Sequence, residues 1–346
     1  MKLLKIIIFY LFFSFLIFHL TGTTGLASNF NRQYTISGKT MGTLYTIKFI
    51  SRKKEPLSLW KLKVDTRLKE VNKKLSMYDP KSELSLFNHQ KISDPVHISS
   101  DFYTILLTAE KLYRLTDGSW DGTVKPLVDL WGFGTKKRIT QIPEADKITL
   151  ALSKTGFDHI HIKKPKMIYK TSDVTLDLGS IAKGYGVDAI AALFTSSGIH
   201  DILVEIGGEL YASGKNKKGE YWSVGISRPD KQFASQGLYK IVRLNNQALA
   251  TSGNYRNFFE INGKTFSHII DPKTGFPVDN QIISASVISK DCTFADGLAT
   301  ALMVMDVQEA IKLVNSLERT ECLIIQKKEQ KLVSHMSEKF DAFVVK

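Results

Sequence analysis

The sequence predicts one mixed α/β domain of the α+β type, in which mixed sheets are flanked by helices. Segments with strand periodicity and segments with helix periodicity follow one another irregularly, without the repeated βαβ units of a barrel or a doubly wound sheet. The sequence also shows no internal duplication and no Pro/Ser-rich linker. These three observations predict a single domain over residues 28–346, preceded by a separate N-terminal segment over residues 1–27.

The N-terminal segment has the order of a secretory signal: a short basic start, a nearly continuous apolar run over residues 6–18, and a small-residue stretch that ends before Ser28. The apolar run is shorter than the ~20 residues that a membrane-spanning helix needs, which favours a cleaved signal peptide over a retained anchor. We therefore expect an exported protein, in the periplasm or at the outer face of the inner membrane. No cysteine lies near this segment, so a lipobox, and with it a typical lipoprotein, is not expected.

The first half of the domain is predicted to be mostly helical. The segment 57–75 carries its apolar residues near helical spacing, and the segment 99–116 is a second amphipathic helix that Ser99 or Ser100 caps. The segment 117–134, rich in Gly, Trp and Asp, is expected to be a structured loop with a short helix. The remaining elements predicted here are a strand over residues 41–50 and a helix over residues 142–155.

The second half of the domain is predicted to be mostly short strands with three helices. Runs of β-branched and aromatic residues between turn residues indicate the strands, and apolar residues at helical spacing indicate the helices. Strands are expected over residues 174–178, 202–206, 222–226, 239–244, 258–261, 285–289, 322–326 and 340–345. Helices are expected over residues 187–197, 293–305 and 307–317.

The formal net charge of +13 does not identify a partner. The basic clusters are scattered along the chain, and none is interleaved with aromatic residues, so no nucleic-acid partner is expected. The only cysteines are Cys292 and Cys322. A disulfide between them is allowed in an oxidising compartment, but two buried thiols are the simpler interpretation.

A glycine-rich segment over residues 177–186, DLGSIAKGYG, follows a predicted strand and opens a helix. Its glycines allow the backbone to approach a ligand closely, and a helix N-terminus offers free N–H groups to an anion. Lys183 adds a positive charge. The segment therefore suits a phosphate or pyrophosphate. It matches neither the Walker A nor the dinucleotide-binding pattern, and a tight structural turn is an equally good interpretation.

Asp296 and Thr300 are four residues apart, so on a helix they share one face. A carboxylate and a hydroxyl are hard oxygen donors that suit Mg²⁺. Such pairs also occur without a metal, as an Asp near a helix N-terminus and a Thr that bonds back to its own helix. Taken alone, the second interpretation is the more common.

His268 precedes a turn, Asp-Pro-Lys-Thr-Gly, at the end of a predicted strand. A histidine there can accept a proton from an attacking hydroxyl, although most such histidines bond to a turn carbonyl. Tyr78 and Trp120 lie in two further loops and can either stack on a planar ring or belong to the core or the rim of a pocket.

Taken together, these segments resemble the FAD:protein FMN transferase family, also called the ApbE-type family. The resemblance extends from about residue 34 to about residue 345. The motifs that carry it, in order, are MGTLYTI, SMYDPKSELSLFN, DGTVKPLVDLWGFG, DLGSIAKGYGVD, VEIGGELYASG, ATSGNYRNFF, FSHIIDPKTGFPV and FADGLATALMVM. The resemblance implies an α/β catalytic domain related to the tunnelling fold, with FAD bound in a cleft.

The resemblance also implies roles for individual residues. The backbone carbonyl of Ser180 and the side chains of Asp296 and Thr300 match the metal ligands of the family, and His268 matches its proposed catalytic histidine. Asp296 and Lys183 are expected to assist catalysis. The positions that match FAD-lining residues are Met41, Tyr78, Ser119, Trp120, Asp121, Asp177, Lys183 and Ile270.

The implied reaction is an Mg²⁺-dependent transfer of FMN from FAD, the substrate, to a Thr or Ser hydroxyl of an acceptor flavoprotein, with AMP as the leaving group. The implied acceptors are membrane redox subunits or secreted proteins that expose a short Asp-x-x-(Ser/Thr)-Gly-Ala-Thr-like segment. Two alternatives stay open. An FAD pyrophosphatase would use water in place of the hydroxyl, and a flavin-binding protein would show no turnover. The paired metal ligands argue against binding alone, because flavin retention needs no Mg²⁺ at the pyrophosphate.

Overall fold

The computed structural model describes residues 31–134, 139–229, 237–254, 258–261, 263–329 and 331–345. The segment predicted to be a signal peptide or anchor, residues 1–27, lies outside the described residues. No helix within the described ranges is both long enough and apolar enough to cross a membrane.

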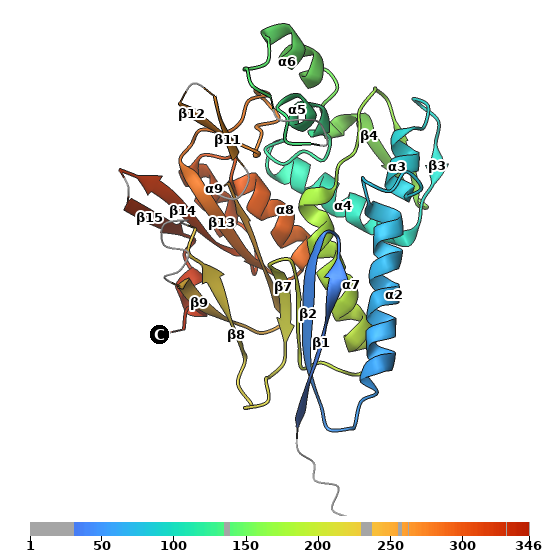
Figure 1. Ribbon diagram of the computed structural model, residues 1–346, viewed down its shortest axis with the longest axis vertical. Coiled ribbons are helices and arrows are strands. Elements are labelled where there is room, and N and C mark those ends of the chain that lie inside the picture. Colours follow the sequence, from blue (N-terminus) through green and yellow to red (C-terminus); the bar gives the residue numbers. More distant parts are fainter. Residues whose placement is uncertain are drawn as a thin grey trace, which may run out of the picture.

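An eight-stranded sheet forms the centre of the fold (Figure 1). Each pair of neighbouring strands is antiparallel, so one face can pack on helices while the other packs on a separate layer. In spatial order its strands are β1 (Arg32–Thr40), β2 (Thr43–Ser51), β6 (Ile202–Ile206), β7 (Glu209–Ser213), β10 (Gln247–Gly253), β13 (Ile282–Ser289), β14 (Glu321–Lys328) and β15 (Lys331–Met336).

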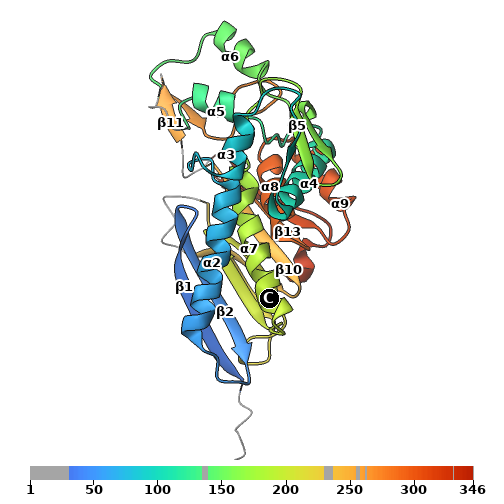
Figure 2. The ribbon, with the colours of Figure 1, turned by 90° about the vertical axis from the view of Figure 1, so that its right-hand side faces the viewer.

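Helices cover one face of this sheet and bury the largest apolar cluster against it. The long helices α2 and α7 run side by side along the sheet, and α8 packs against α7, β10 and β13 (Figures 1 and 2). The helices of this layer are α2 (Leu57–Leu75), α3 (Glu83–Asn88), α4 (Ser100–Leu115), α7 (Gly179–Ser196), α8 (Cys292–Leu302) and α9 (Val307–Asn315).

A two-stranded sheet covers part of the other face. It consists of β8 (Trp222–Ser227) and β9 (Leu238–Leu244), which pack with the C-terminal 3₁₀ turn η3 (Phe340–Phe343) on a second apolar cluster. Trp222 is buried there, and its indole N–H donates a hydrogen bond of 3.0 Å to the carbonyl of Ser213 at the end of β7.

A third apolar cluster, around Trp131, joins two parts of the chain that lie far apart in sequence. It packs α5 (Lys125–Leu130) and α6 (Ala145–Leu152) against β11 (Phe258–Ile261) and β12 (Lys264–Ser267), which lie together at one end of the sheet (Figure 1). Nearby, the 3₁₀ turn η1 (Phe157–His159) leads into a small sheet of β3 (Val96–His97), β5 (Met167–Lys170) and β4 (Ile160–Lys163).

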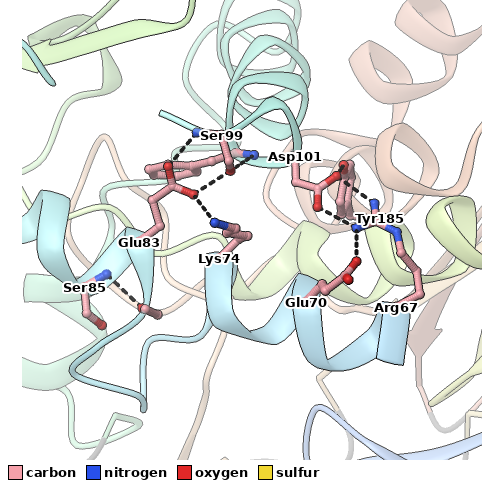
Figure 3. A network of polar contacts seen from close by, with 10 residues as sticks. Arg67, Glu70, Lys74, Glu83, Ser85, Ser99, Asp101 and Tyr185 are labelled. Carbon is pink, nitrogen blue, oxygen red and sulfur yellow. Dashed lines mark hydrogen bonds and ion pairs between the residues drawn. The ribbon is translucent and has the colours of Figure 1, made fainter. Parts of the chain in front are cut away.

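A network of polar contacts ties α2 and α4 to the middle of α7 (Figure 3). Both terminal guanidinium nitrogens of Arg67 donate to the carboxylate of Asp101, at 2.6 and 2.7 Å, and the hydroxyl of Tyr185 donates to the same carboxylate at 2.6 Å. A bidentate Arg–carboxylate pair fixes the direction as well as the distance of its partners. The network therefore holds Tyr185, on α7, in a fixed position relative to α2 and α4.

Most predicted helices are confirmed, and the errors concern the ends of some elements and several strands. The helix predicted from residue 187 begins at Gly179, and the segment 41–42 is the turn between β1 and β2 rather than the start of a strand. The strand predicted over residues 174–178 is wrong, because this irregular segment bonds to the side chain of Asn88 and to the carbonyl of Gly122.

The strand predicted over residues 340–345 is also wrong. It forms η3, and only Val344 makes an isolated bridge. The sequence interpretation missed several elements: β1, β3, β4, β5, β7, β10, β12, β15 and α3. Cys292 and Cys322 are buried free thiols, as the simpler interpretation had it.

Candidate active site

One cleft of about 650 Å³ lies where the helical layer, the sheet and the third cluster meet. This volume is in the usual range for a pocket that holds a cofactor-sized molecule. All the residues predicted for the site line it, with Met41 as the exception. They are Tyr78, Ser119, Trp120, Asp121, Asp177, Ser180, Lys183, His268, Ile270, Asp296 and Thr300.

Met41 lies in the turn between β1 and β2, with a φ of 48°. Its side chain is directed at α7: a Cβ placed on Gly186 would lie 3.0 Å from the methyl carbon of Met41. Met41 therefore packs beside the helix that carries Ser180 and Lys183, and is not one of the residues lining the cleft. Its contact with FAD stays a prediction.

Gly184 of the 177–186 segment brings α7 into backbone contact with α8. A Cβ on Gly184 would lie 2.4 Å from the carbonyl oxygen of Cys292, closer than any side chain allows. Gly297 of α8 also lies at a close approach, since a Cβ there would lie 2.2 Å from the side chain of Leu112 and 2.7 Å from that of Ile181. Helix packing therefore requires Gly184 and Gly297, and this packing sets Asp296 next to the first turns of α7.

Asp296 is 3% exposed and sits at the junction of the two helices. Its Oδ2 accepts a hydrogen bond of 3.0 Å from the backbone N–H of Gly184 and lies 3.5 Å from Nζ of Lys183. Burial raises the pKa of this carboxyl group, and the charge of Lys183 opposes that effect. Within the described part of the chain, its side-chain hydrogen bond and its ion pair both involve Oδ2, which leaves Oδ1 available to a ligand in the cleft.

The other two predicted metal ligands flank this carboxylate. The hydroxyl of Thr300 donates 3.2 Å to the carbonyl of Asp296 and lies 3.0 Å from the hydroxyl of Ser252. The back-bonded threonine that the sequence left open is thus observed, and such a hydroxyl keeps a lone pair for a cation. In a regular α-helix the N–H of Gly184 faces the carbonyl of Ser180. Here Asp296 competes for that N–H, so the Ser180 carbonyl is less committed to the helix.

These three donors fit a hard cation in their chemistry: one carboxylate oxygen, one hydroxyl and one backbone carbonyl. Among the described residues no group of three or more His, Cys, Asp or Glu side chains is placed to hold a metal ion. A site with so few protein ligands is typical of Mg²⁺, which commonly keeps waters and binds phosphate oxygens.

Lys183 lies between two buried carboxylates. Its Nζ is 3.1 Å from Oε1 of Glu209 and 3.5 Å from Oδ2 of Asp296. Burial alone lowers the pKa of Lys183, but the charges of Asp296 and Glu209 outweigh it and raise the pKa above its usual value. Lys183 is therefore a permanent cation in the floor of the cleft. Burial, reinforced by the charge of Asp296, raises the pKa of Glu209 to about 7.

The two aromatic residues differ in their surroundings. Trp120 is 2% exposed, and its indole N–H donates 3.0 Å to the hydroxyl of Ser180. It is a buried wall of the cleft that also fixes the Ser180 side chain. Tyr78 is 86% exposed although it lines the same cleft. An exposed aromatic ring at the edge of a cleft is suited to stack on a planar ligand ring.

Asp121 and Asp177 shape the loops beside the cleft. The carboxylate of Asp121 accepts hydrogen bonds from the backbone N–H groups of Thr123 and Phe157, and that of Asp177 accepts one from Gly179. Burial raises the pKa of both carboxyl groups, and these backbone donors oppose it.

His268 follows β12 directly and lines the cleft. Its ring packs edge-on against Phe133, with the ring centroids 6.4 Å apart. The turn that follows is fixed by a hydrogen bond of 2.8 Å from the N–H of Gly275 to the carbonyl of Asp271. The buried indole of Trp131 donates to the carbonyl of Gly275 at 2.8 Å, which anchors the turn in the third cluster.

The sequence interpretation missed several polar groups of the cleft, among them the carboxylate of Glu209 and the hydroxyls of Thr251 and Ser252 at the end of β10. The motif VEIGGELYASG, with paired glycines before an acidic residue, was the available signal for Glu209. Gly207 and Gly208 have φ values of 65° and 111°, a turn that glycine adopts without strain.

Asp188 of α7 fixes the start of α8. Its carboxylate accepts hydrogen bonds from the backbone N–H groups of Cys292 and Thr293, both at 2.8 Å, and from the Thr293 hydroxyl. Burial raises the pKa of Asp188 to about 6, against the effect of these three donors. Because α8 carries Asp296 and Thr300, Asp188 is a positioning residue for the candidate metal ligands.

The raised pKa of Asp188 predicts a pH dependence of stability. The native carboxyl group holds its proton up to pH about 6, whereas the unfolded one releases it near 3.8. The raised pKa of Asp188 therefore stabilises the native state below pH ~4. Its contribution to the free energy of unfolding, at most about 3 kcal/mol, is lost as the pH rises to ~6. The stability of Asp188→Asn should lack this pH dependence. Urea denaturation should therefore show that the wild-type protein exceeds Asp188→Asn in free energy of unfolding by more at pH 4.5 than at pH 7. An advantage that grows with pH would contradict the raised pKa.

Comparison with known proteins gives a consistent result. A sequence model of the ApbE family matches residues 41–324. A protein of Vibrio cholerae serotype O1 named FAD:protein FMN transferase is 38% identical over 315 residues, which cover 91% of this chain and 93% of that protein. A protein of Haemophilus influenzae with the same name is 37% identical over 299 residues, covering 84% of this chain and 86% of that protein.

Solved structures show the same fold. The flavin transferase ApbE from Vibrio cholerae has a TM-score of 0.81 at 36% identity, covering 90% of this chain and 99% of that chain. The apo form of the Pseudomonas stutzeri flavinyl transferase ApbE has a TM-score of 0.82 at 31% identity, covering 90% of this chain and 97% of that chain. The predicted mixed α/β fold is thereby confirmed as the fold of these transferases.

Proposed function

Because this chain belongs to the ApbE family, we propose that it is an FAD:protein FMN transferase that uses Mg²⁺ and releases AMP. The observation that carries the proposal is the charge arrangement in the floor of the cleft. A permanently charged Lys183 and the oxygen donors of Asp296, Thr300 and Ser180 line one cavity, together with the exposed ring of Tyr78. A substitution at the pyrophosphate that joins a flavin to a nucleoside is served by these groups together: cationic charge, metal ligands and a stacking surface.

The proposed reaction is a phosphoryl substitution in FAD. The hydroxyl oxygen of an acceptor Thr or Ser forms a bond to the FMN-side phosphorus, and the bond from that phosphorus to the bridging oxygen breaks. AMP leaves with the bridging oxygen, and the hydroxyl proton passes to a base. His268 lines the cleft and is the proposed base.

Other residues of the cleft have separate roles in the proposed reaction. Lys183 stabilises the negative charge that develops on the phosphoryl oxygens. Asp296, Thr300 and the carbonyl of Ser180 are the residues that would hold Mg²⁺. When bound, Mg²⁺ supplies further neutralisation of charge on the pyrophosphate. Tyr78 orients the substrate through its ring, and the buried Trp120 keeps Ser180 in place.

A transfer assay distinguishes this activity from FAD hydrolysis, in which water would replace the acceptor hydroxyl. With FAD and Mg²⁺ alone, AMP release should be slow, because no oriented nucleophile is present. Adding an acceptor protein with a reactive Thr should raise AMP release sharply, and mass spectrometry should find one covalent FMN per AMP. Rapid formation of free FMN that ignores every acceptor would make the protein an FAD pyrophosphatase instead.

The acceptor is a protein, and we propose that it is a membrane redox subunit or a secreted flavoprotein. The resemblance that suggests these classes also suggests a short acceptor segment of the form Asp-x-x-(Ser/Thr)-Gly-Ala-Thr. In the transfer assay, an acceptor protein in which the reactive Thr of this segment is replaced by Val should accept no FMN, while its fold stays the same.

A further inference from the structure

Glu209 is a buried acidic group of the cleft that the reaction above does not use. It begins β7, and its side chain is 6% exposed. Its Oε1 lies 3.1 Å from Nζ of Lys183. Its Oε2 is buried without a hydrogen-bond partner among the described residues. A half-paired buried carboxylate costs stability, which argues that its position has another purpose.

The chain is shaped to let Lys183 reach Glu209. Gly207 has a φ of 65°, and a Cβ placed there would lie 3.4 Å from Cδ of Lys183 and 2.8 Å from the side chain of Thr43. A Cβ there would clash with Thr43, while it would be at ordinary contact distance from the aliphatic stem of the lysine. The glycine turn before β7 thus lets Glu209 and the ammonium come together, and the ammonium lies between Glu209 on one side and Asp296 on the other.

This arrangement sets two cations in competition for Asp296. An ammonium beside a carboxylate offsets its charge, and it also repels a divalent cation that approaches the other oxygen of the same carboxylate. The distances show that Lys183 lies closer to Glu209, at 3.1 Å, than to Asp296, at 3.5 Å. With Glu209 uncharged, Asp296 would be the one carboxylate among the described residues that still forms an ion pair with the ammonium.

We propose that Glu209 is a positioning residue that draws the ammonium of Lys183 away from Asp296, so that Asp296 keeps the negative charge it needs to bind a divalent cation. The inference rests on the proposed function for the identity of the cation. Glu209 acts through Lys183, and it does not itself bind the metal.

The test is Mg²⁺ binding, measured by isothermal titration calorimetry on the full-length protein without flavin. Glu209→Gln keeps the size of the side chain and removes its charge. It should weaken Mg²⁺ binding about tenfold or more, which is the usual effect of losing a residue that supports a metal ligand. Glu205→Gln is the matched control: Glu205 lines the same cleft, but its carboxylate accepts a hydrogen bond from the N–H of Gly208 instead. The control should change Mg²⁺ affinity little.

The double variant Glu209→Gln/Lys183→Met separates action through Lys183 from direct metal binding. Removing the ammonium removes the competitor, so the double variant should bind Mg²⁺ more tightly than Glu209→Gln, near the wild-type affinity. If the double variant binds as weakly as Glu209→Gln, Glu209 is itself a ligand and the inference is wrong. Thermal unfolding of each variant checks that the fold is kept.

Two further results would overturn the inference: an unchanged Mg²⁺ affinity of Glu209→Gln, or a wild-type protein that does not bind Mg²⁺. The transfer assay tests a different claim from the Mg²⁺ titration. A protein that binds Mg²⁺ as predicted but only hydrolyses FAD would leave the role of Glu209 intact and would refute the transferase.

Discussion

Asp296→Ala is expected to abolish Mg²⁺ binding and to lower the transfer rate by roughly a thousandfold or more, since metal charge is worth several kcal/mol in such reactions. Asp296 is the one carboxylate among the three predicted ligands, and a methyl group supplies no charge and no oxygen donor. It is also buried at 3% exposure, so solvent cannot replace it easily. FAD should still bind through its rings, and quenching of flavin fluorescence measures this binding.

Asp291→Ala is the matched control for this variant. Asp291 lies at the start of the same helix, where its carboxylate accepts a hydrogen bond of 2.9 Å from the N–H of Phe294. Loss of this helix cap should cost about 1 kcal/mol of stability and leave Mg²⁺ affinity nearly unchanged. If Asp296→Ala retained Mg²⁺-dependent turnover, Asp296 would be a structural residue of the α7–α8 contact.

His268→Ala is expected to lower the acceptor-dependent rate by about 10²–10⁴, the usual contribution of a general base. Binding of FAD and of Mg²⁺ should change little, because His268 approaches the cleft from the β12 side and the metal ligands lie on α7 and α8. Rapid mixing of enzyme, FAD and acceptor measures the rate of AMP release. Added imidazole should restore part of the rate, which a merely structural histidine would not allow.

The control for this variant is His161→Ala. His161 lies on β4, where its ring stacks on Tyr169 at 4.8 Å, and it is not among the residues that line the cleft. Its replacement should leave the transfer rate unchanged. If His268→Ala kept the wild-type rate, another base, such as solvent, would take the proton of the attacking hydroxyl.

The helices that bury a regular apolar stripe were predictable from sequence. The helix α2 buries Trp60, Val64, Leu68, Val71 and Leu75, and its predicted bounds agree with the observed ones. By contrast, β1 is an edge strand with mainly exposed or half-exposed residues, so its sequence lacks a clear apolar face. Local patterns predict an element only where that element buries one face of its own.

The start of α7 and the segment 174–178 show why the remaining elements could not be predicted. Glycines normally weaken a helix, yet Gly184 lies within α7 because only a glycine fits against the backbone of Cys292. In the segment 174–178 buried and less buried residues alternate as in a strand. Its N–H groups, however, bond to Asn88 and Gly122, which no local pattern reveals.

The candidate site was more predictable than the topology. The residues with proposed chemical roles, such as His268 and Asp296, stand in recognisable motifs, and the structure brings them to one cleft. Glu209 was missed because its importance arises from a contact with Lys183, which lies on another element. Motifs identify the groups that meet a ligand, whereas the groups that act on those residues become visible only in three dimensions.

The cleft is assembled from distant parts of the chain, with walls that extend from Tyr78 to Val304. During synthesis the chain emerges from its N-terminus, so α7 is complete long before α8, its partner in the site, exists. A nascent chain that ends before α8 has Lys183 and Glu209 but no Asp296. The three predicted metal ligands, Ser180, Asp296 and Thr300, are therefore present together only after α8 has been synthesised, so the proposed site is completed late in the synthesis of the chain.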